Sequence, residues 1–306
     1  MTAHFADRLL DAIEKKGSPI CVGIDPVYET LPDAVAGSAD ERAPHDVEAC
    51  VDAIYEFTTK VLEVIRPHVP CVKFQSAYFE KYLWEGVQAY YELIHEAKEL
   101  GFVVIGDVKR GDIGSTSEAY ALAHLSEIDF EGIDEAATPD AITVNAFLGM
   151  DSIEPFVNAA RDAGKGLFVL VRTSNRGSAD LQDAQSIDGR TFSEMLADKL
   201  QPVAEAPGML GRSGWSALGA VVGATQPHTM ATLRQRLPRS IFLLPGYGTQ
   251  GATAEMTRAA FRDGKGAIVS ASRSILYAHQ KQPGREWQAA VFRAVQDMKS
   301  DLKSVS

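Results

Sequence analysis

The stretch FVVIGDVKRGDIGST (102–116) holds the pattern from which the fold is predicted. It opens with a nearly continuous apolar run, which is typical of a β-strand that is buried on both faces. Arg110 and Gly111 then turn the chain, and Ser115 with Glu118 has the spacing of a capping box, which predicts that a helix starts here. The stretch therefore forms one strand–turn–helix unit.

Seven more apolar runs repeat this unit, each followed by a segment with helical periodicity. Eight such units in 306 residues predict a (β/α)₈ TIM barrel, and a doubly wound open sheet is the alternative that the pattern alone leaves open. No linker-like stretch divides the chain, so we expect one α/β domain over residues 1–306 with an N-terminal helix in front of the barrel. The eight runs lie at 19–25, 69–75, 102–109, 141–147, 166–174, 217–225, 241–248 and 267–274, and the clearest helical segments at 47–65, 78–100 and 285–302.

Two polar, turn-rich stretches, 26–45 and 175–190, follow the first and the fifth apolar run. In a barrel, the segments that follow strands lie at the C-terminal face, where active sites are built. We therefore expect extended loops after strands 1 and 5, beside the active site.

The composition excludes several classes of function. The net charge is −11, from 30 basic and 41 acidic residues, and the basic residues are scattered, which argues against binding to nucleic acid or to an anionic membrane. No apolar stretch approaches the roughly 20 residues that span a bilayer, and the N-terminus lacks the pattern of a signal peptide. We therefore expect a soluble, cytoplasmic protein. Cys21, Cys50 and Cys71 show no Cys-x-x-Cys spacing, so neither a zinc site nor a redox pair is predicted.

Charged residues stand where buried strands end. Asp107 and Lys109 are two apart, so they point to the same side of the third strand, and Lys73 adds a second cation from the neighbouring strand. Asp25 ends the first strand. Buried charges are unfavourable unless they are paired. An Asp–Lys pair that only seals a strand end is one interpretation, but alternating carboxylates and ammonium groups, each keeping the other ionised, favour a catalytic array.

The last two strands carry a separate signal for phosphate. TIM barrels often hold phosphate with the loops after strands 7 and 8. Here those loops are PGYGTQGAT (245–253), which is rich in glycine, and SASRSILY (270–277), which contains Arg273. Either loop alone could be an ordinary turn, but both together at the expected strands predict a phosphate site.

With these motifs the sequence resembles the orotidine 5′-phosphate decarboxylase family, in particular its longer bacterial form. The segment GDVKRGDIGST (106–116) matches the family's Asp-x-Lys-x-x-Asp-Ile-x-x-Thr signature, and the resemblance extends from GID (23–25) to ASRS (271–274). It implies a TIM barrel that converts orotidine 5′-phosphate into uridine 5′-phosphate and carbon dioxide, without cofactor or metal, as a homodimer with shared active sites.

The resemblance also implies roles for individual residues. Lys73, Asp107, Lys109 and Asp112 would form the catalytic array, with Lys109 protonating the carbanion, and Asp112, Ile113 and Thr116 would reach into the partner's site. Asp25 and Lys73 would hold the ribose, Ser174 (or the adjacent Thr173) the pyrimidine, and Gln250 with Arg273 the phosphate. Ser272, before the phosphate arginine, stands where compact members often have glycine.

Two alternatives stay open. A metal-dependent sugar-phosphate lyase of the same superfamily shares the Asp-x-Lys-x-x-Asp core, but such relatives tend to place a glutamate where this chain has Lys73. A non-catalytic nucleotide-binding barrel would usually have lost part of the charged array, and here all four members are present.

Overall fold

A computed structural model describes residues 3–37, 46–127, 130–133, 135–282 and 286–305. Its centre is a closed barrel of eight parallel strands in chain order, with β1 pairing to β2 on one side and to β8 on the other. The prediction of a TIM barrel is thus confirmed, and the open-sheet alternative is wrong. The strands are β1 (Ile20–Ile24), β2 (Cys71–Gln75), β3 (Val103–Arg110), β4 (Ala141–Val144), β5 (Gly166–Arg172), β6 (Ser216–Val222), β7 (Ser240–Leu244) and β8 (Ala267–Ala271).

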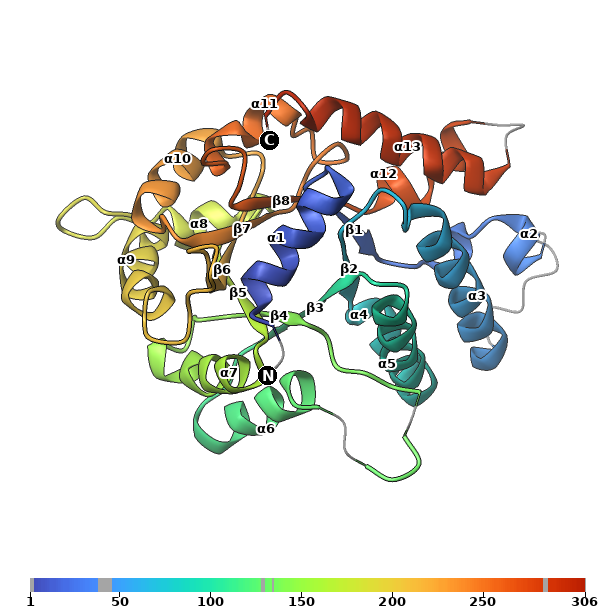
Figure 1. The fold of residues 1–306 in the computed structure, drawn as a ribbon, viewed down its shortest axis with the longest axis horizontal. Helices are drawn as coiled ribbons and strands as arrows, with labels where there is room; N and C mark the ends of the chain where they lie inside the picture. Colours follow the sequence, from blue (N-terminus) through green and yellow to red (C-terminus); the bar gives the residue numbers. More distant parts are fainter. Residues whose placement is uncertain (1–2, 38–45, 128–129, 134, 283–285, 306) are drawn as a thin grey trace.

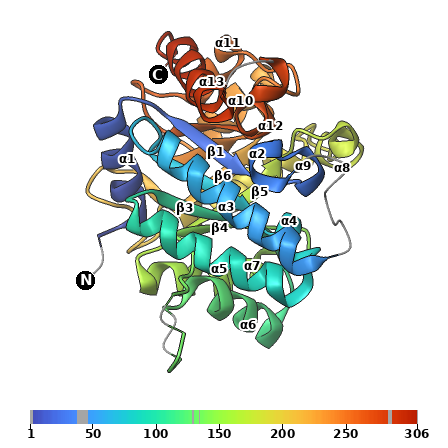
Figure 2. The same cartoon turned by 90° about the vertical axis from the view of Figure 1, so that its right-hand side faces the viewer.

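Helices surround the barrel (Figure 1), and α3 and α5 pack side by side along its outside (Figure 2). Within the described part of the chain, no helix is long and apolar enough to cross a membrane. The helices are α1 (Phe5–Lys16), α2 (Asp33–Ala36), α3 (Val47–Ile65), α4 (Ala77–Glu80), α5 (Leu83–Glu99), α6 (Gly114–Leu125), α7 (Met150–Ala163), α8 (Ala179–Gln182), α9 (Phe192–Ala204), α10 (Pro227–Arg236), α11 (Ala254–Thr257), α12 (Arg273–Leu276) and α13 (Trp287–Leu302).

Two local predictions need correction. The single helix expected over 78–100 is divided into α4 and α5, because Leu83 adopts a left-handed backbone conformation with φ 57°. The capping box expected at Ser115 and Glu118 does not form. Helix α6 begins one residue earlier than Ser115, and its N-cap, Ile113, has no side-chain hydrogen bond to the helix. Spacing alone did not reveal where the chain leaves the strand.

Helix α1 closes the N-terminal end of the barrel, across which it lies in Figure 1. Phe5 is buried and packs edge-on against Phe168 of β5, with 6.0 Å between the ring centroids. Gly166, the first residue of β5, leaves room for this ring, since a Cβ there would lie 2.2 Å from Phe5 Cδ1. Helix α1 and the Phe5 ring therefore cover the N-terminal end of the barrel.

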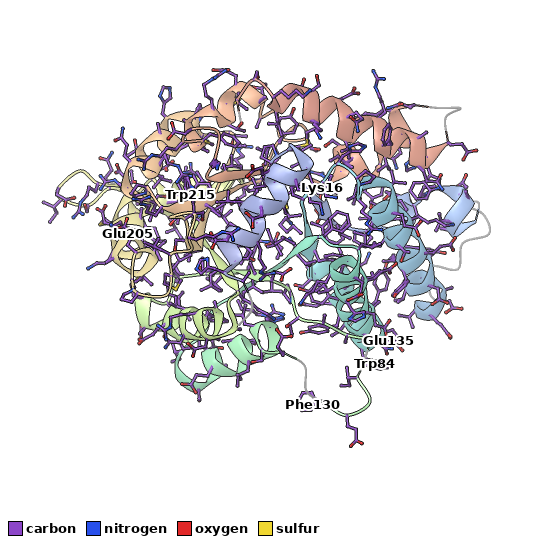
Figure 3. The ribbon with its side chains drawn as sticks, viewed as in Figure 1. Lys16, Trp84, Phe130, Glu135, Glu205 and Trp215 are labelled. Atoms are coloured by element: carbon purple, nitrogen blue, oxygen red, sulfur yellow. The ribbon has the colours of Figure 1, made fainter. Side chains whose placement is uncertain are left out.

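The predicted extended loops surround that end. The loop after β1 is described from Asp25 to Gly37, and residues 38–45 of the predicted 26–45 stretch lie outside the described residues. The loop after β5 contains α8 and ends where α9, one of the helices outside the barrel, begins. Side chains fill the space between strands and helices, whereas the exposed rings of Trp84 and Phe130 lie at the periphery (Figure 3).

Candidate active site

A cluster of opposite charges lies at the C-terminal end of β2 and β3, centred on Asp107. Lys73 Nζ lies 2.7 Å from Asp107 Oδ2, and Lys109 Nζ lies 2.6 Å from Oδ1. Two neutral donors complete the carboxylate's surroundings: Gln75 Nε2 at 3.1 Å from Oδ2 and Thr143 Oγ1 at 2.9 Å from Oδ1. Asp107 therefore accepts four hydrogen bonds, the capacity of an ionised carboxylate.

The cluster keeps Asp107 and Lys73 charged. Burial alone would raise the pKa of Asp107, but Lys73 and then Lys109 outweigh it and hold that pKa well below the ordinary value. Burial alone would lower the pKa of Lys73, but Asp107 and then Asp25 raise it above the ordinary value for lysine. Both groups are thus ionised at neutral pH, although each is less than a tenth exposed.

Strand register and a local irregularity bring the cluster together. Gln75 is the register partner of Asp107 across β2 and β3, so both side chains reach the same end of the barrel. The pairing of β3 with β4 shifts between Gly106 and Arg110, and Lys109 within this shift has φ 46°. This left-handed conformation is uncommon for lysine. The Lys109 N–H donates to Thr143 Oγ1 at 2.9 Å, which helps to hold it.

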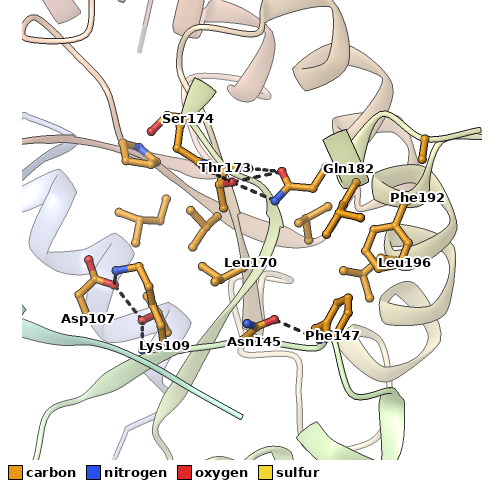
Figure 4. Close-up of a pocket in the computed structure, with 18 of the residues that line it drawn as sticks. Asp107, Lys109, Asn145, Phe147, Leu170, Thr173, Ser174, Gln182, Phe192 and Leu196 are labelled. Carbon is orange, nitrogen blue, oxygen red and sulfur yellow. Dashed lines mark hydrogen bonds and ion pairs between the residues drawn. The ribbon is translucent and has the colours of Figure 1, made fainter. Parts of the chain in front are cut away.

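A cavity of about 940 Å³ opens above the cluster. Asp25, Lys73, Asp107 and Lys109 line one part, and Gln250 also lines the cavity. In Figure 4 the Asp107–Lys109 pair lies on one side of the cavity and apolar side chains lie on the other. The apolar side includes Phe147, Phe192 and Leu196.

Thr173 and Ser174 both line the cavity, and their hydrogen bonds distinguish them. Gln182 holds Thr173 at two points: its Oε1 accepts the Thr173 N–H at 2.7 Å, and its Nε2 donates to Thr173 Oγ1 at 2.9 Å. Ser174 makes no hydrogen bond with any residue that the structure describes. The geometry thus favours Ser174 over Thr173 as the group available to a ligand.

Four of the predicted site residues do not line the cavity of their own chain. The Asp112 carboxylate accepts the backbone N–H of Ile113 at 2.8 Å, and Ile113 is 60% exposed. Thr116 is exposed on the first turn of α6. Arg273 begins α12 and is exposed beside the mouth.

Sequence reasoning missed two members of the cluster, Gln75 and Thr143. Gln75 could have been found, because it lies two residues after Lys73 and so shares its face of the strand. Thr143 stands inside an apolar run and gave no signal, since the side on which it meets Asp107 depends on the register of β4.

The fold and the cluster together define a TIM-barrel enzyme with a buried Lys–Asp–Lys array at the mouth of the barrel. The chain belongs to the orotidine 5′-phosphate decarboxylase / HUMPS family, whose model matches residues 18–290.

Individual relatives agree with this assignment. The chain is 40% identical over 306 residues to the orotidine 5′-phosphate decarboxylase of Rhodopirellula baltica, covering 98% of this chain and 99% of that protein. It is 39% identical over 280 residues to the Clostridium novyi protein of that name, covering 92% and 91%. Among solved structures, the OMP decarboxylase of Leishmania donovani superimposes with a TM-score of 0.71 at 29% identity, covering 98% of this chain and 97% of that one.

Proposed function

We propose that this chain decarboxylates orotidine 5′-phosphate to uridine 5′-phosphate in pyrimidine biosynthesis, with Lys109 as the proton donor. The family match supports the reaction, and the Lys73–Asp107–Lys109 cluster carries the residue assignments. Two ammonium groups share one carboxylate, but their exposure differs: the Lys109 side chain is 45% exposed and that of Lys73 only 8%. Lys109 is therefore the more accessible of the two cations, and we assign it to the reacting carbon.

In the proposed reaction the bond between the pyrimidine C6 and its carboxylate breaks, and the electron pair stays on C6 as carbon dioxide leaves. The Lys109 ammonium stabilises this negative charge and transfers a proton to C6. Asp107 faces the substrate carboxylate. Like charges about 4 Å apart repel by roughly 4 kcal/mol at an effective dielectric of about 20, and loss of carbon dioxide relieves that repulsion. Lys73 stays beside Asp107 and keeps it ionised.

The phosphate would bind where the loops after β7 and β8 meet. A Cβ placed on Gly248 would lie 3.5 Å from Ser274 Oγ, so the two loops are neighbours. Gln250 lines the cavity, and Arg273 lies on the second loop. Arg273→Ala is expected mainly to weaken nucleotide binding, because it removes the charge-assisted hydrogen bonds that the arginine would donate to the phosphate.

We further propose a cytoplasmic homodimer in which Asp112, Ile113 and Thr116 complete the partner's site. The exposed apolar side chains of Ile113 (60%), Phe147 (68%) and Leu148 (51%) support this proposal, since they follow β3 and β4 beside the mouth. Large apolar residues that gather beside a site are typical of an interface.

The test is the ultraviolet absorbance of orotidine 5′-phosphate mixed with the protein in excess EDTA, with Lys109→Ala as the comparison. We expect decay to the uridine 5′-phosphate spectrum with the wild-type chain, and almost none with Lys109→Ala. Calorimetry should show that the variant still binds uridine 5′-phosphate. A folded wild-type protein that gives no decay would contradict the proposal and favour a magnesium-dependent sugar-phosphate lyase.

A further inference from the structure

Ser272 makes a hydrogen bond that links the ends of β1 and β8. Its hydroxyl lies 2.6 Å from Asp25 Oδ2 and 3.0 Å from the carbonyl oxygen of Gly23. The shorter contact goes to a carboxylate, the stronger acceptor of the two. Ser272 is also the N-cap of α12 and the residue directly before Arg273.

The backbone of β1 leaves space for this hydroxyl. A Cβ built on Gly23 would lie 2.2 Å from Ser272 Oγ and 3.1 Å from Ser272 Cβ. No side chain at position 23 could coexist with the hydroxyl in this position. The two residues are therefore complementary: glycine on β1 leaves the space, and serine after β8 fills it with a donor.

This bond leaves the other oxygen of Asp25 without a donor. Asp25 Oδ1 is buried and has no hydrogen-bond partner among the described residues. Its nearest cation, Lys73 Nζ, is 3.9 Å away, beyond hydrogen-bond distance. A buried carboxylate oxygen without a donor is energetically unfavourable. Because Asp25 lines the cavity, a ligand that brings a hydroxyl group to it would relieve this deficit.

We infer that Ser272 is a positioning residue for sugar recognition: it holds the Asp25 carboxylate so that Oδ1 accepts a hydrogen bond from a ribose hydroxyl of the substrate. The inference rests on the proposed function, since it assumes a ribonucleotide in the cavity. Ser272 does not touch the reacting carbon and acts through Asp25. Because Arg273 follows it, the same turn of chain orients the sugar acceptor and carries the phosphate arginine.

The experiment compares two ligands, uridine 5′-phosphate and 2′,3′-dideoxyuridine 5′-phosphate, on the wild-type chain and Ser272→Ala, by calorimetry. We expect Ser272→Ala to bind uridine 5′-phosphate about tenfold more weakly, the scale of one charge-assisted hydrogen bond. It should bind the dideoxy ligand as the wild type does, because that ligand has no hydroxyl for Asp25. Asp25→Asn should likewise bind uridine 5′-phosphate more weakly while its affinity for the dideoxy ligand stays unchanged. Adding Ser272→Ala to Asp25→Asn should lower the affinity for uridine 5′-phosphate little further.

Two further variants separate this role from general damage to the fold. Ser272→Thr keeps a hydroxyl and should retain most of the preference for the ribose ligand. Ser240 lies at the start of β7, at the opposite end of the barrel, and its buried hydroxyl has no hydrogen-bond partner among the residues that the structure describes. Ser240→Ala should leave both affinities unchanged.

Equal losses for both ligands in Ser272→Ala, or no loss for either, would overturn the role of Ser272 while the wild-type chain still decarboxylates its substrate. A wild-type chain with neither turnover nor binding of uridine 5′-phosphate would instead overturn the proposed function, and this inference with it. The wild-type control therefore tells the two failures apart.

Discussion

Thr143 shows how a single neutral side chain can hold two catalytic groups. Its hydroxyl accepts the Lys109 N–H and donates to Asp107 Oδ1, both at 2.9 Å, so the position of its one proton is determined. Both contacts are lost together if the hydroxyl is removed. The backbone of Lys109, already in the left-handed region, then loses a bond that holds it, and Asp107 loses one of its four donors.

We expect Thr143→Val to lower kcat about 10- to 100-fold, as a shift of the catalytic groups by a fraction of an ångström to 1 Å would. The Kd for uridine 5′-phosphate should change less than threefold, since the product lacks the carboxylate that Asp107 faces. Thr143→Ser keeps the hydroxyl and should retain most of the activity. Steady-state kinetics measures kcat and calorimetry measures the Kd of both variants. An unchanged kcat in Thr143→Val would show that Lys109 and Asp107 keep their positions without the hydrogen bonds of the Thr143 hydroxyl.

The same residues show what the sequence could predict at this scale. Lys73, Asp107 and Lys109 were found because a charge in an apolar strand requires an explanation, and the structure brings all three together. Thr143 is as important to the geometry but is an ordinary residue in a strand. Its role depends on the register between β3 and β4, which shifts at this point and which no local pattern encodes.

At the scale of elements, the loop after β5 is held by a buried arginine. Arg172 is 2% exposed; its Nε and one terminal nitrogen bind the two oxygens of Asp183 at 2.9 and 2.8 Å. Its other terminal nitrogen donates to the Thr173 carbonyl at 2.9 Å. Such a bidentate pair is geometrically specific. It ties the end of β5, where Ser174 lines the cavity, to the far side of α8.

Weakening the Arg172–Asp183 ion pair should therefore affect substrate binding. We expect Asp183→Asn to raise KM for orotidine 5′-phosphate about tenfold, which corresponds to ~1.4 kcal/mol, with kcat changed much less. Asp180→Asn, an exposed change on α8 in the same loop, is the matched control. Steady-state kinetics would contradict this role if Asp183→Asn kept the wild-type KM, or if the control variant showed the same rise.

The sequence predicted the elements better than their ends. All eight strands formed where apolar runs occur, because burial on both faces imposes that composition. Most predicted strands ran too far at the C-terminal end, by two residues for β5 and four for β7, since the loop residues that follow are also small or apolar. The break between α4 and α5 was missed because helical periodicity continues through it.

For the molecule as a whole, a buried lysine outside the site leads us to expect a specific pH dependence of the free energy of unfolding. Lys165 is 3% exposed beside the start of β5, and its ammonium donates to Thr138 Oγ1. Burial lowers its pKa from 10.5 to about 8, and Glu127, at 3.7 Å, offsets this only in part. Between pH 8 and pH 10.5 this lysine therefore binds a proton in the unfolded chain but not in the folded chain. Its contribution makes the free energy of unfolding rise with pH in that range.

We expect the free energy of unfolding of the wild type, relative to Lys165→Met, to rise by at most about 1.4 kcal/mol per pH unit above pH 8. Below pH 8 the difference should be constant. Urea unfolding of both proteins between pH 7 and pH 10 measures it, and the subtraction removes the titration of other groups. A difference that stays flat across this range would mean that Lys165 keeps an ordinary pKa.

The proposed sharing of active sites between subunits leads to a prediction that can be tested only on the assembled dimer. Asp112 lies outside the cavity of its own chain, whereas Lys109 lines it. If Asp112 completes the partner's site, Lys109→Ala and Asp112→Asn damage the same site from different chains. A heterodimer of the two variants would then combine the intact Lys109 of one chain with the intact Asp112 of the other, giving one wild-type site.

The two inactive variants should therefore regain activity when they are unfolded together and refolded. With random pairing, half of the dimers are mixed and each has one intact site of two, so about a quarter of wild-type activity is expected. Each variant refolded alone is the control, and sedimentation confirms that both assemble. If the mixture stayed as inactive as its components while dimers formed, Asp112 would have to act within its own chain. The loop 111–113 would then have to move until that carboxylate reached Lys109.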